Sequence, residues 1–515
     1  MSEKNTWQNF KERTTGKKIF IFGAGEQTKK FLNRLDMYDF LPQRYEGIID
    51  NDERKQGDSI EHYIGEKERF IFYKEICSID VLERYQDADV AILITSLRRY
   101  SEIENQVRCV GKNHIWIMEI LDQDKQFSRD EQKQVTTFQK QLMDKYYLKE
   151  INRNKILFYN TVFGSHGDAI IPELKRISDT IDIVCVIKNE IKNRIEGVRY
   201  IYEGDFEEYI KELETAHVWF YGDVIPEFAR KKEGQICIRS KHWSSITLKS
   251  FYLDDKEFCE TSDKKNTILS NAKIIDYALT GSEFDEKTMA SGFGLNAKYL
   301  RVGSPRSDVL FDDKYYLEIR KHYGLNGKKI LLYAPTFRRV TNKYGAIEFE
   351  REPQLDYAKL ASELNRITED DWVVMYKAHP SVALFSGDRL ENMSNVINVS
   401  DYENLGHLLS AADLVVTDYS SLMFEPAYVG KPVILYAPDR DEYIGVERNL
   451  LIDYDKLPFE CAITESDLYE KIRTLDLVQY KKNVREFLEE YGIEEDGHAS
   501  ERAAREIYKL LQREL

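Results

Sequence analysis

Short apolar segments alternate with longer amphipathic ones along most of the chain, and this alternation sets the expected fold. The first apolar segment is residues 18–22, and similar segments recur at 155–160, 328–337 and 414–416. Runs this short, each followed by a polar turn and a helix-like stretch, are typical of buried strands in βαβ units. Strands that alternate with helices predict parallel, doubly wound sheets, so we expect an α/β fold.

Breaks in this pattern divide the 515 residues into several domains, because one hydrophobic core does not grow to that size. We expect two successive Rossmann-like domains that face each other, and in open α/β sheets ligands bind beyond the carboxyl ends of the strands. The predicted parts are an N-terminal Rossmann-like domain of uncertain role (1–125), a charged connecting helix (126–153) and the two facing domains (154–325 and 326–515).

Composition narrows the classes of function. The net charge of −16 argues against nucleic-acid binding but leaves room for a local basic pocket. No segment is apolar enough for its length to span a bilayer, and the N-terminus lacks the apolar core of a secretory signal. The six cysteines lie far apart, as expected for reduced thiols in the cytoplasm.

The N-terminal block carries an incomplete nucleotide-binding fingerprint. Gly23 and Gly25 follow the first strand and Asp50 closes the next one, but Thr28 stands where the fingerprint has its third glycine. The pattern therefore indicates either a weak nucleotide site at Gly23, Gly25 and Asp50 or a Rossmann-like domain without a ligand that serves interaction or regulation.

Cationic and hydroxyl side chains follow successive strands of the last block. The carboxyl ends of parallel strands meet at one edge of a sheet, so we expect these side chains to converge. Arginine, lysine and hydroxyl groups suit an anionic phosphate, and helix N-terminal amides add further donors. The set is Thr336, Arg338, Lys377, His379, Thr417, Asp418, Ser420 and Ser421.

Two further features depend on such a phosphate site. His242 follows a strand of the middle block; alone it reads as a loop histidine, but across a cleft from a phosphate it suits a general base. Two Asp-x-Asp pairs, at 439–441 and 453–455, could hold a divalent ion beside a pyrophosphate, although solvated acidic turns explain them more simply.

Seven motifs between residues 154 and 511 resemble, in order, those of the CDP-glycerol glycerophosphotransferases, which build teichoic acids and related capsular polymers. The motifs are ILFYNTVFGSHGD, DVIPEFARKKEGQICIRSKH, VGSPRSDVLF, ILLYAPTFR, KAHP, VTDYSSLMFEPAYVGKPVILY and DGHASERAAREI. The resemblance implies a GT-B fold, a pair of Rossmann-like domains around a cleft, here preceded by the extra N-terminal domain.

The resemblance also implies a reaction. An alditol phosphate would pass from CDP-glycerol or CDP-ribitol to a hydroxyl of a polyol-phosphate or lipid-linked glycan acceptor, and CMP would leave. His242 would be the base and His379 would stabilise the donor phosphates or the CMP. The substrate-binding residues would be Arg306, Thr336, Lys377 and Glu425, with Arg338, Ser420 and Ser421 on the pyrophosphate and Thr417 and Asp418 shaping the turn.

One departure from the family's motifs concerns the acceptor side. The family usually reads His-Gly-Thr-Pro-Leu-Lys, whereas this chain has Trp243 and two extra residues before Lys249.

We expect a cytoplasmic enzyme with peripheral contact at the inner face of the membrane, no nucleic-acid partner and no certain cofactor, with Mg²⁺ only weakly indicated. An oligomer stays open. The alternatives are a GT-B glycosyltransferase that uses a nucleotide sugar and a non-enzymatic regulatory or scaffold protein.

Overall fold

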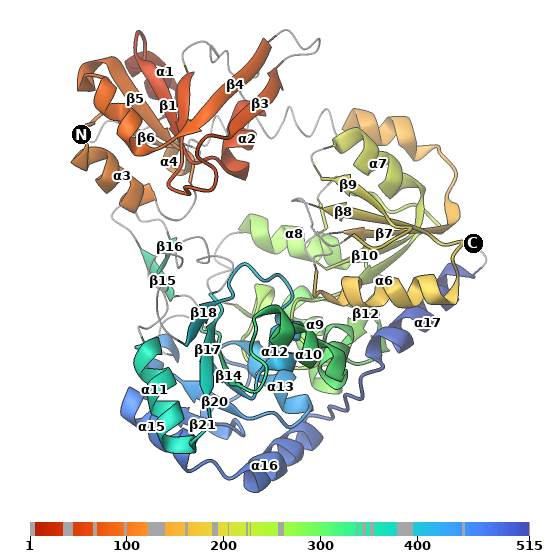
Figure 1. The fold of residues 1–515 in the computed structure, drawn as a ribbon. Helices are drawn as coiled ribbons and strands as arrows, with labels where there is room; N and C mark the ends of the chain where they lie inside the picture. Colours follow the sequence, from red (N-terminus) through yellow and green to blue (C-terminus); the bar gives the residue numbers. More distant parts are fainter. Residues whose placement is uncertain are drawn as a thin grey trace. The chain divides into compact units, whose positions relative to one another are not determined.

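The structure is a computed structural model, and its contacts divide the chain into two compact units (Figure 1). One unit is residues 1–138 with 339–349, and the other is residues 139–338 with 350–515. The structure describes residues 6–33, 45–64, 70–96, 100–121, 140–159, 163–187, 194–203, 205–222, 225–226, 228–255, 262–336, 338–341, 347–350, 355–378, 395–444 and 449–513.

The smaller unit contains a six-stranded sheet in the order β3-β4-β2-β1-β5-β6, parallel except that β3 runs antiparallel to β4. Alternate residues of β1 enter cores on opposite faces, Ile19 and Ile21 on one and Phe20 and Phe22 on the other. The strands are β1 (Lys18–Phe22), β2 (Tyr45–Ile49), β3 (Ser59–Ile64), β4 (Phe70–Cys77), β5 (Val90–Ile94) and β6 (Ile115–Ile117). The helices are α1 (Trp7–Arg13), α2 (Glu26–Asn33), α3 (Tyr100–Cys109) and α4 (Met118–Leu121).

The larger unit begins with a helical segment, residues 140–147, and a seven-stranded parallel sheet in the order β13-β12-β11-β10-β7-β8-β9. We call this sheet and its helices the first half. Its strands are β7 (Asn152–Tyr159), β8 (Asp182–Ile187), β9 (Arg199–Tyr202), β10 (Ala216–Tyr221), β11 (Ile236–Arg239), β12 (Tyr277–Thr280) and β13 (Lys298–Arg301). Its helices are α6 (His166–Ile177), α7 (Phe206–Thr215), α8 (Ser262–Ala272) and α9 (Glu283–Phe293).

The second half is a six-stranded parallel sheet in the order β18-β17-β14-β19-β20-β21. Its strands are β14 (Lys329–Tyr333), β17 (Trp372–Tyr376), β18 (Val396–Asn398), β19 (Leu414–Thr417), β20 (Val433–Tyr436) and β21 (Glu460–Ala462). Its helices are α10 (Asp313–His322), α11 (Tyr357–Thr368), α12 (Leu405–Ala411), α13 (Phe424–Tyr428), α14 (Arg440–Glu442), α15 (Glu465–Arg473) and α16 (Leu477–Glu490). Strands β15 (Arg338–Thr341) and β16 (Ile347–Glu350) form a separate two-stranded sheet, most of which belongs to the smaller unit.

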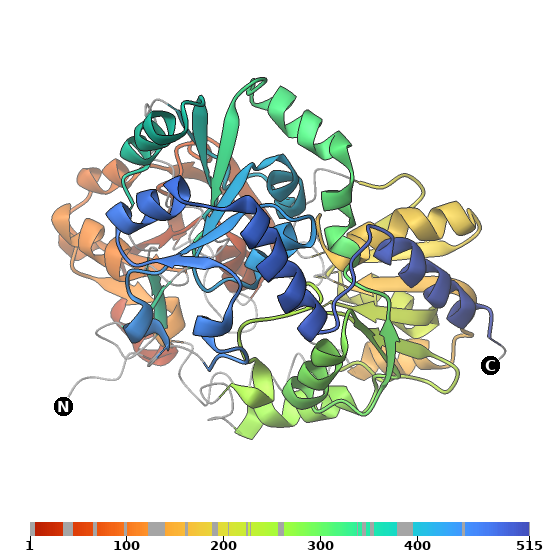
Figure 2. The ribbon, with the colours of Figure 1, turned by 90° about the horizontal axis from the view of Figure 1, so that it is seen from below.

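The chain returns to the first half after α16. Helix α17 (Ala499–Leu511) packs against α6, and Figures 1 and 2 both show the two helices side by side. Ala503, Ile507 and Leu510 are buried in the same core as Ile156 and Phe158 of β7. The first half is therefore built from two stretches of chain that are far apart in sequence.

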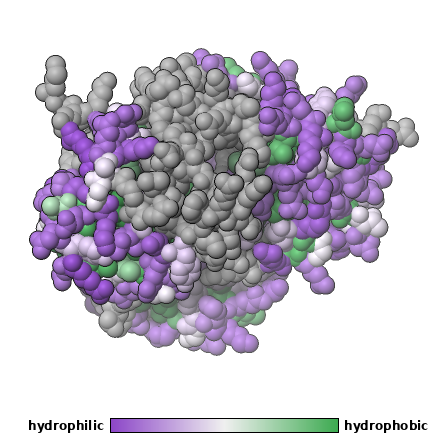
Figure 3. All heavy atoms as spheres, turned by 90° about the horizontal axis from the view of Figure 1, so that it is seen from above, coloured by the Kyte–Doolittle hydropathy of each residue, from purple (hydrophilic) through white to green (hydrophobic). Residues whose placement is uncertain are grey.

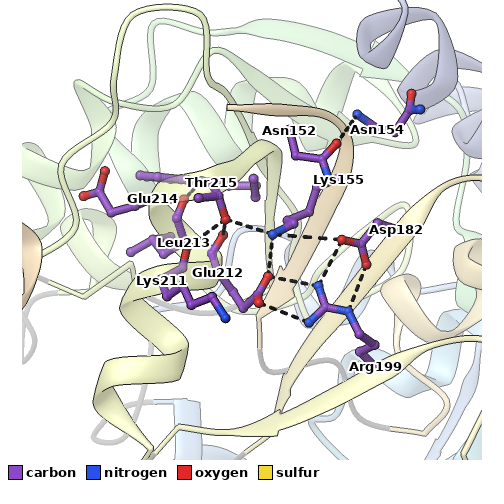
Figure 4. Close-up of polar contacts among 12 residues, drawn as sticks. Asn152, Asn154, Lys155, Asp182, Arg199, Lys211, Glu212, Leu213, Glu214 and Thr215 are labelled. Carbon is purple, nitrogen blue, oxygen red and sulfur yellow. Dashed lines mark hydrogen bonds and ion pairs between the residues drawn. The ribbon is translucent and has the colours of Figure 1, made fainter. Parts of the chain in front are cut away.

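A charged network lies at the amino ends of the first-half strands, the edge opposite to the one where ligands bind (Figure 4). Lys155 Nζ is 2.7 Å from Glu212 Oε2, and Arg199 joins Glu212 (3.0 Å) to Asp182 (3.0 Å). Burial alone would raise the pKa of Glu212, but the hydrogen bonds from Arg199 and Lys155 outweigh it and lower that pKa. The network fastens α7 to β7, β8 and β9.

On the face in Figure 3, the described residues are mainly hydrophilic and the hydrophobic ones are scattered singly, as on ordinary protein surfaces. Among the residues that the structure describes, no helix combines the length and the hydropathy that crossing a membrane requires.

Candidate active site

The second-half sheet brings predicted phosphate-binding residues to one edge. Its strand order reverses between β14 and β19, which is the position where open α/β sheets bind ligands. Thr336 follows β14, Lys377 follows β17, and Thr417 and Asp418 lie at the end of β19. The predicted His379 lies outside the described residues.

The two threonines at this reversal differ in their hydrogen bonds. Thr417 Oγ1 donates to the carbonyl of Ala334 at 2.7 Å, so its hydroxyl braces two neighbouring strands. Thr336 donates its backbone N–H to Asp418 Oδ1 (2.8 Å), but its buried Oγ1 has no hydrogen-bond partner among the described residues. A buried hydroxyl is normally paired, so Thr336 presents a group suited to a ligand atom.

Arg338 is held by two carboxylates. Its Nη1 is 3.0 Å from Asp418 Oδ2, and its Nε and Nη2 are 2.5 and 3.0 Å from the two oxygens of Asp439. Burial would lower the pKa of Arg338, but Asp439 and Asp418 raise it above its ordinary value. The guanidinium also lies 5.1 Å from the ring centres of Tyr419 and Tyr443. A pyrophosphate would therefore have to compete with two carboxylates for this charge.

Carboxylates of the two Asp-x-Asp pairs, at 439–441 and 453–455, also have partners within the protein. Asp439 also accepts a hydrogen bond from Tyr419 Oη (3.0 Å), and Asp455 forms an ion pair with Arg440 (2.7 Å). Asp453 accepts the backbone N–H of Asp455 (3.1 Å). In the described part of the chain, no group of three or more His, Cys, Asp or Glu side chains is arranged to hold a metal ion. Three of the four carboxylates in the two pairs, those of Asp439, Asp453 and Asp455, thus already have partners within the protein.

Lys377 is the remaining described cation of the predicted set. Its Nζ donates to the carbonyl of Ser400 at 2.7 Å. Burial lowers its pKa, and the charge of Asp401 opposes that shift. An ammonium has three N–H donors, so the bond to Ser400 leaves capacity for a phosphate oxygen.

Of the two serines after β19, one caps a short helix and the other connects the two halves. Ser420 caps the 3-10 helix Ser421–Met423 by accepting the backbone N–H of Leu422 at 3.4 Å. Ser421 Oγ lies 3.1 Å from Thr247 Oγ1 and accepts the backbone N–H of Leu248 at 3.0 Å. Both of these partners belong to the loop that begins with His242.

Arg306 and Glu425 also meet between the halves. Glu425 is buried on α13, and its Oε1 lies 2.9 Å from Arg306 Nη2. Ser307 Oγ donates to the same carboxylate at 3.2 Å. Arg306 in turn donates from Nη1 to the backbone carbonyl of His242 at 2.7 Å. Glu425, which we expected to bind substrate, is thus bound to protein groups.

The loop of residues 242–250, which we call the His242 loop, is anchored in the second half. His242 is exposed, whereas Ile246 and Leu248 are fully buried in the second-half core. The backbone of Ser250 donates to the carbonyl of Asn449 at 3.0 Å. The His242 loop therefore ties the candidate base to the second half.

Trp243 does not project into the cleft. Its ring is 4% exposed and packs in the first-half core, 4.1 Å from the ring of Phe251. Its Nε1 donates to Asp285 Oδ1 at 2.9 Å. The buried side chain of Trp243 therefore anchors the start of the His242 loop in the first half.

Two residues near His242 were not predicted from the sequence. His166 is 1% exposed at the start of α6, and its Nε2 lies 2.7 Å from the carbonyl of Trp243. Burial, then the charges of Lys241 and Arg306, hold its pKa well below the usual value. Asp285, at the start of α9, is fully buried and forms an ion pair with Lys241. The only sequence signal was His166 itself, inside the motif that opens the family resemblance.

The residues of the N-terminal fingerprint form hydrogen bonds within the protein. Gly23 adopts φ of 116°, and a Cβ there would lie 3.0 Å from Thr95 Oγ1. Asp50 Oδ2 accepts the backbone N–H of Ala24, the residue between Gly23 and Gly25, at 2.6 Å. Thr28 Oγ1 is 2.7 Å from Thr95 Oγ1. The carboxylate of Asp50 is thus hydrogen-bonded to the glycine turn itself.

The curated proteins that the chain resembles include teichoic acid polymerases. The chain is 30% identical to a teichoic acid ribitol-phosphate polymerase, TarK, of Staphylococcus aureus over 49% of each chain. It is 28% identical to a teichoic acid poly(glycerol phosphate) polymerase of Staphylococcus epidermidis over 62% of this chain and 45% of that protein. It thus spans about half the length of the curated relatives that it matches first.

The fold also matches a solved structure. The wall teichoic acid polymerase TagF aligns with a TM-score of 0.64 and 24% identity, covering 76% of this chain and 98% of that one. This likeness confirms the predicted GT-B fold. Residues 142–509 match the family described as CDP-Glycerol:Poly(glycerophosphate) glycerophosphotransferase, and the chain belongs to that family.

Proposed function

We propose that this protein transfers an alditol phosphate, glycerol phosphate or ribitol phosphate, from a CDP-alditol to a hydroxyl of a teichoic acid or capsular polymer. The observation that carries the proposal is the contact of Ser421 with Thr247 and Leu248. It joins the loop of the candidate base to the turn where the donor pyrophosphate would bind.

In this reaction His242 would take the proton of the acceptor hydroxyl. The hydroxyl oxygen would form a bond to the phosphorus that carries the alditol, while the bond from that phosphorus to the bridging oxygen breaks and CMP leaves. Such transfer depends on positioning and on donors aimed at charge that develops on oxygens. Thr336, Lys377 and Ser420 would supply these donors, with His379 as a further expected one.

The proposal includes no resident metal. Because Asp439 is committed to Arg338, any Mg²⁺ that assists would bind with the donor's pyrophosphate. Adding EDTA or MgCl₂ to the assay tests this point. The proposal also includes a lipid-linked acceptor at the inner face of the membrane, and co-sedimentation with vesicles that contain the acceptor would test it.

The decisive assay measures CMP release from CDP-glycerol and from CDP-ribitol with a polyol-phosphate acceptor. We expect turnover of at least one donor, and His242→Ala should abolish it while the dissociation constant of the donor stays within about twofold. If neither donor is turned over with any such acceptor, the proposal fails. Preferential thermal stabilisation by a UDP-sugar would instead favour a glycosyltransferase.

A further inference from the structure

His242 is the single exposed residue in a stretch that is otherwise buried. Its neighbours Lys241 and Trp243 are 4% exposed, and the residues from Ser244 to Leu248 are buried as well. The imidazole therefore projects from a backbone that is packed on both sides. What holds that backbone decides the position and direction of the Cα–Cβ bond from which the imidazole extends.

Asp285 binds the side chains on both sides of His242. One carboxylate oxygen accepts the indole N–H of Trp243 at 2.9 Å, and the other contacts the ammonium of Lys241. The backbone N–H of Gly281 donates to this second oxygen at 2.9 Å. The Lys241–Asp285 pair is fully buried, and such pairs add little stability compared with apolar packing. Fixing a geometry is the role that suits such a pair best.

His166 and Arg306 bind two consecutive carbonyls of the same backbone. Arg306 Nη1 donates to the carbonyl of His242 at 2.7 Å, and His166 Nε2 lies 2.7 Å from the carbonyl of Trp243. The backbone N–H of Arg306 donates to His166 Nδ1 at 3.4 Å, so His166 is neutral and carries its proton on Nε2. Glu425 holds the guanidinium of Arg306 from the second half.

We infer that Asp285, His166 and Arg306 are positioning residues that fix the backbone from which the His242 imidazole extends toward the acceptor hydroxyl. This inference rests on the proposed role of His242 as base. A shift of about 1 Å in a reacting group can cost about 100-fold in rate. These residues would therefore act on turnover and leave donor binding largely unchanged.

The test compares His166→Leu, which removes both hydrogen bonds, with His166→Gln, whose amide can donate to Trp243 and accept from Arg306. We expect His166→Leu to lower kcat about 100-fold while the donor's dissociation constant, measured by calorimetry with CDP-glycerol, stays within about twofold. The kcat of His166→Gln should be at least about tenfold higher than that of His166→Leu. Equal kcat in His166→Leu and the wild type, no recovery in His166→Gln, or a parallel loss of donor affinity would each overturn the inference.

A control separates positioning from general loss of stability. Asp413→Asn breaks an ion pair with Arg320 in the second half, away from the His242 loop, and should leave kcat unchanged. If Asp413→Asn lowers kcat as much as His166→Leu does, the inference fails. His242→Ala is measured alongside: if it keeps the wild-type kcat, the proposed base role is wrong, whereas an inactive His242→Ala beside a fully active His166→Leu refutes only the positioning role.

Discussion

Replacing Thr336 by valine should change stability and donor binding in opposite senses. The substitution keeps the shape of the side chain and removes a buried hydroxyl that has no hydrogen-bond partner among the described residues. Burying an unpaired polar group costs about 1–3 kcal/mol, so Thr336→Val should raise the free energy of unfolding by about that amount. A hydrogen bond to a charged phosphate contributes about 1.5–3 kcal/mol, so the affinity for CDP-glycerol should fall about 10- to 150-fold.

Thr417→Val is the matched control because it lies at the end of the adjacent strand and its hydroxyl is paired. It leaves the carbonyl of Ala334 without that bond and should lower the free energy of unfolding by about 1–3 kcal/mol. Urea unfolding and calorimetric titration with CDP-glycerol measure both quantities. If Thr336→Val is less stable than the wild type, or if it binds CDP-glycerol equally well, the assignment of Thr336 to the donor site is refuted.

Three further substitutions test other parts of the structure. Burial raises the pKa of Glu495 from 4.5 to about 7. Because the folded protein holds this proton more tightly than the unfolded chain does, the melting temperature should decline as the pH rises between these two values. Glu495→Gln should abolish that decline. An unchanged slope would contradict this. Glu212→Gln leaves the buried Lys155 without its closest carboxylate and should cost about 3–5 kcal/mol in urea unfolding; a cost below about 1 kcal/mol would show that the network is dispensable. Leu248→Ala truncates a fully buried side chain and should cost about 2–5 kcal/mol, and a change near zero would place the His242 loop outside the core.

The sequence predicted the sheets well because parallel strands that are buried on both faces read as continuous apolar runs. It also predicted that residues after β14, β17 and β19 share one edge, which follows from parallel topology alone. It could not predict their partners. The guanidinium of Arg338 lies between two carboxylates, one of them 101 residues away, and such pairing depends on how distant turns pack.

The same limit explains His166 and Asp285. Each lies at the start of a helix, and nothing in its local pattern shows that the His242 loop packs over it. Arg306 and Glu425, 119 residues apart, were both predicted to bind substrate, but their ion pair depends on the contact between the halves. Residue type at a strand end can be read from one chain, whereas tertiary pairing cannot.

The return of α17 has a consequence for synthesis. Ala503, Ile507 and Leu510 complete the core around β7, yet about 340 residues of chain are translated between that strand and this helix. During translation the apolar surface of α6 stays uncovered until α17 emerges, whereas the second-half sheet can form earlier. Removing residues 499–511 should therefore leave the apolar core of the first half exposed and cause aggregation, whereas the second-half sheet, whose core does not include α17, still folds. The two halves cannot be separated by one cut in the gene.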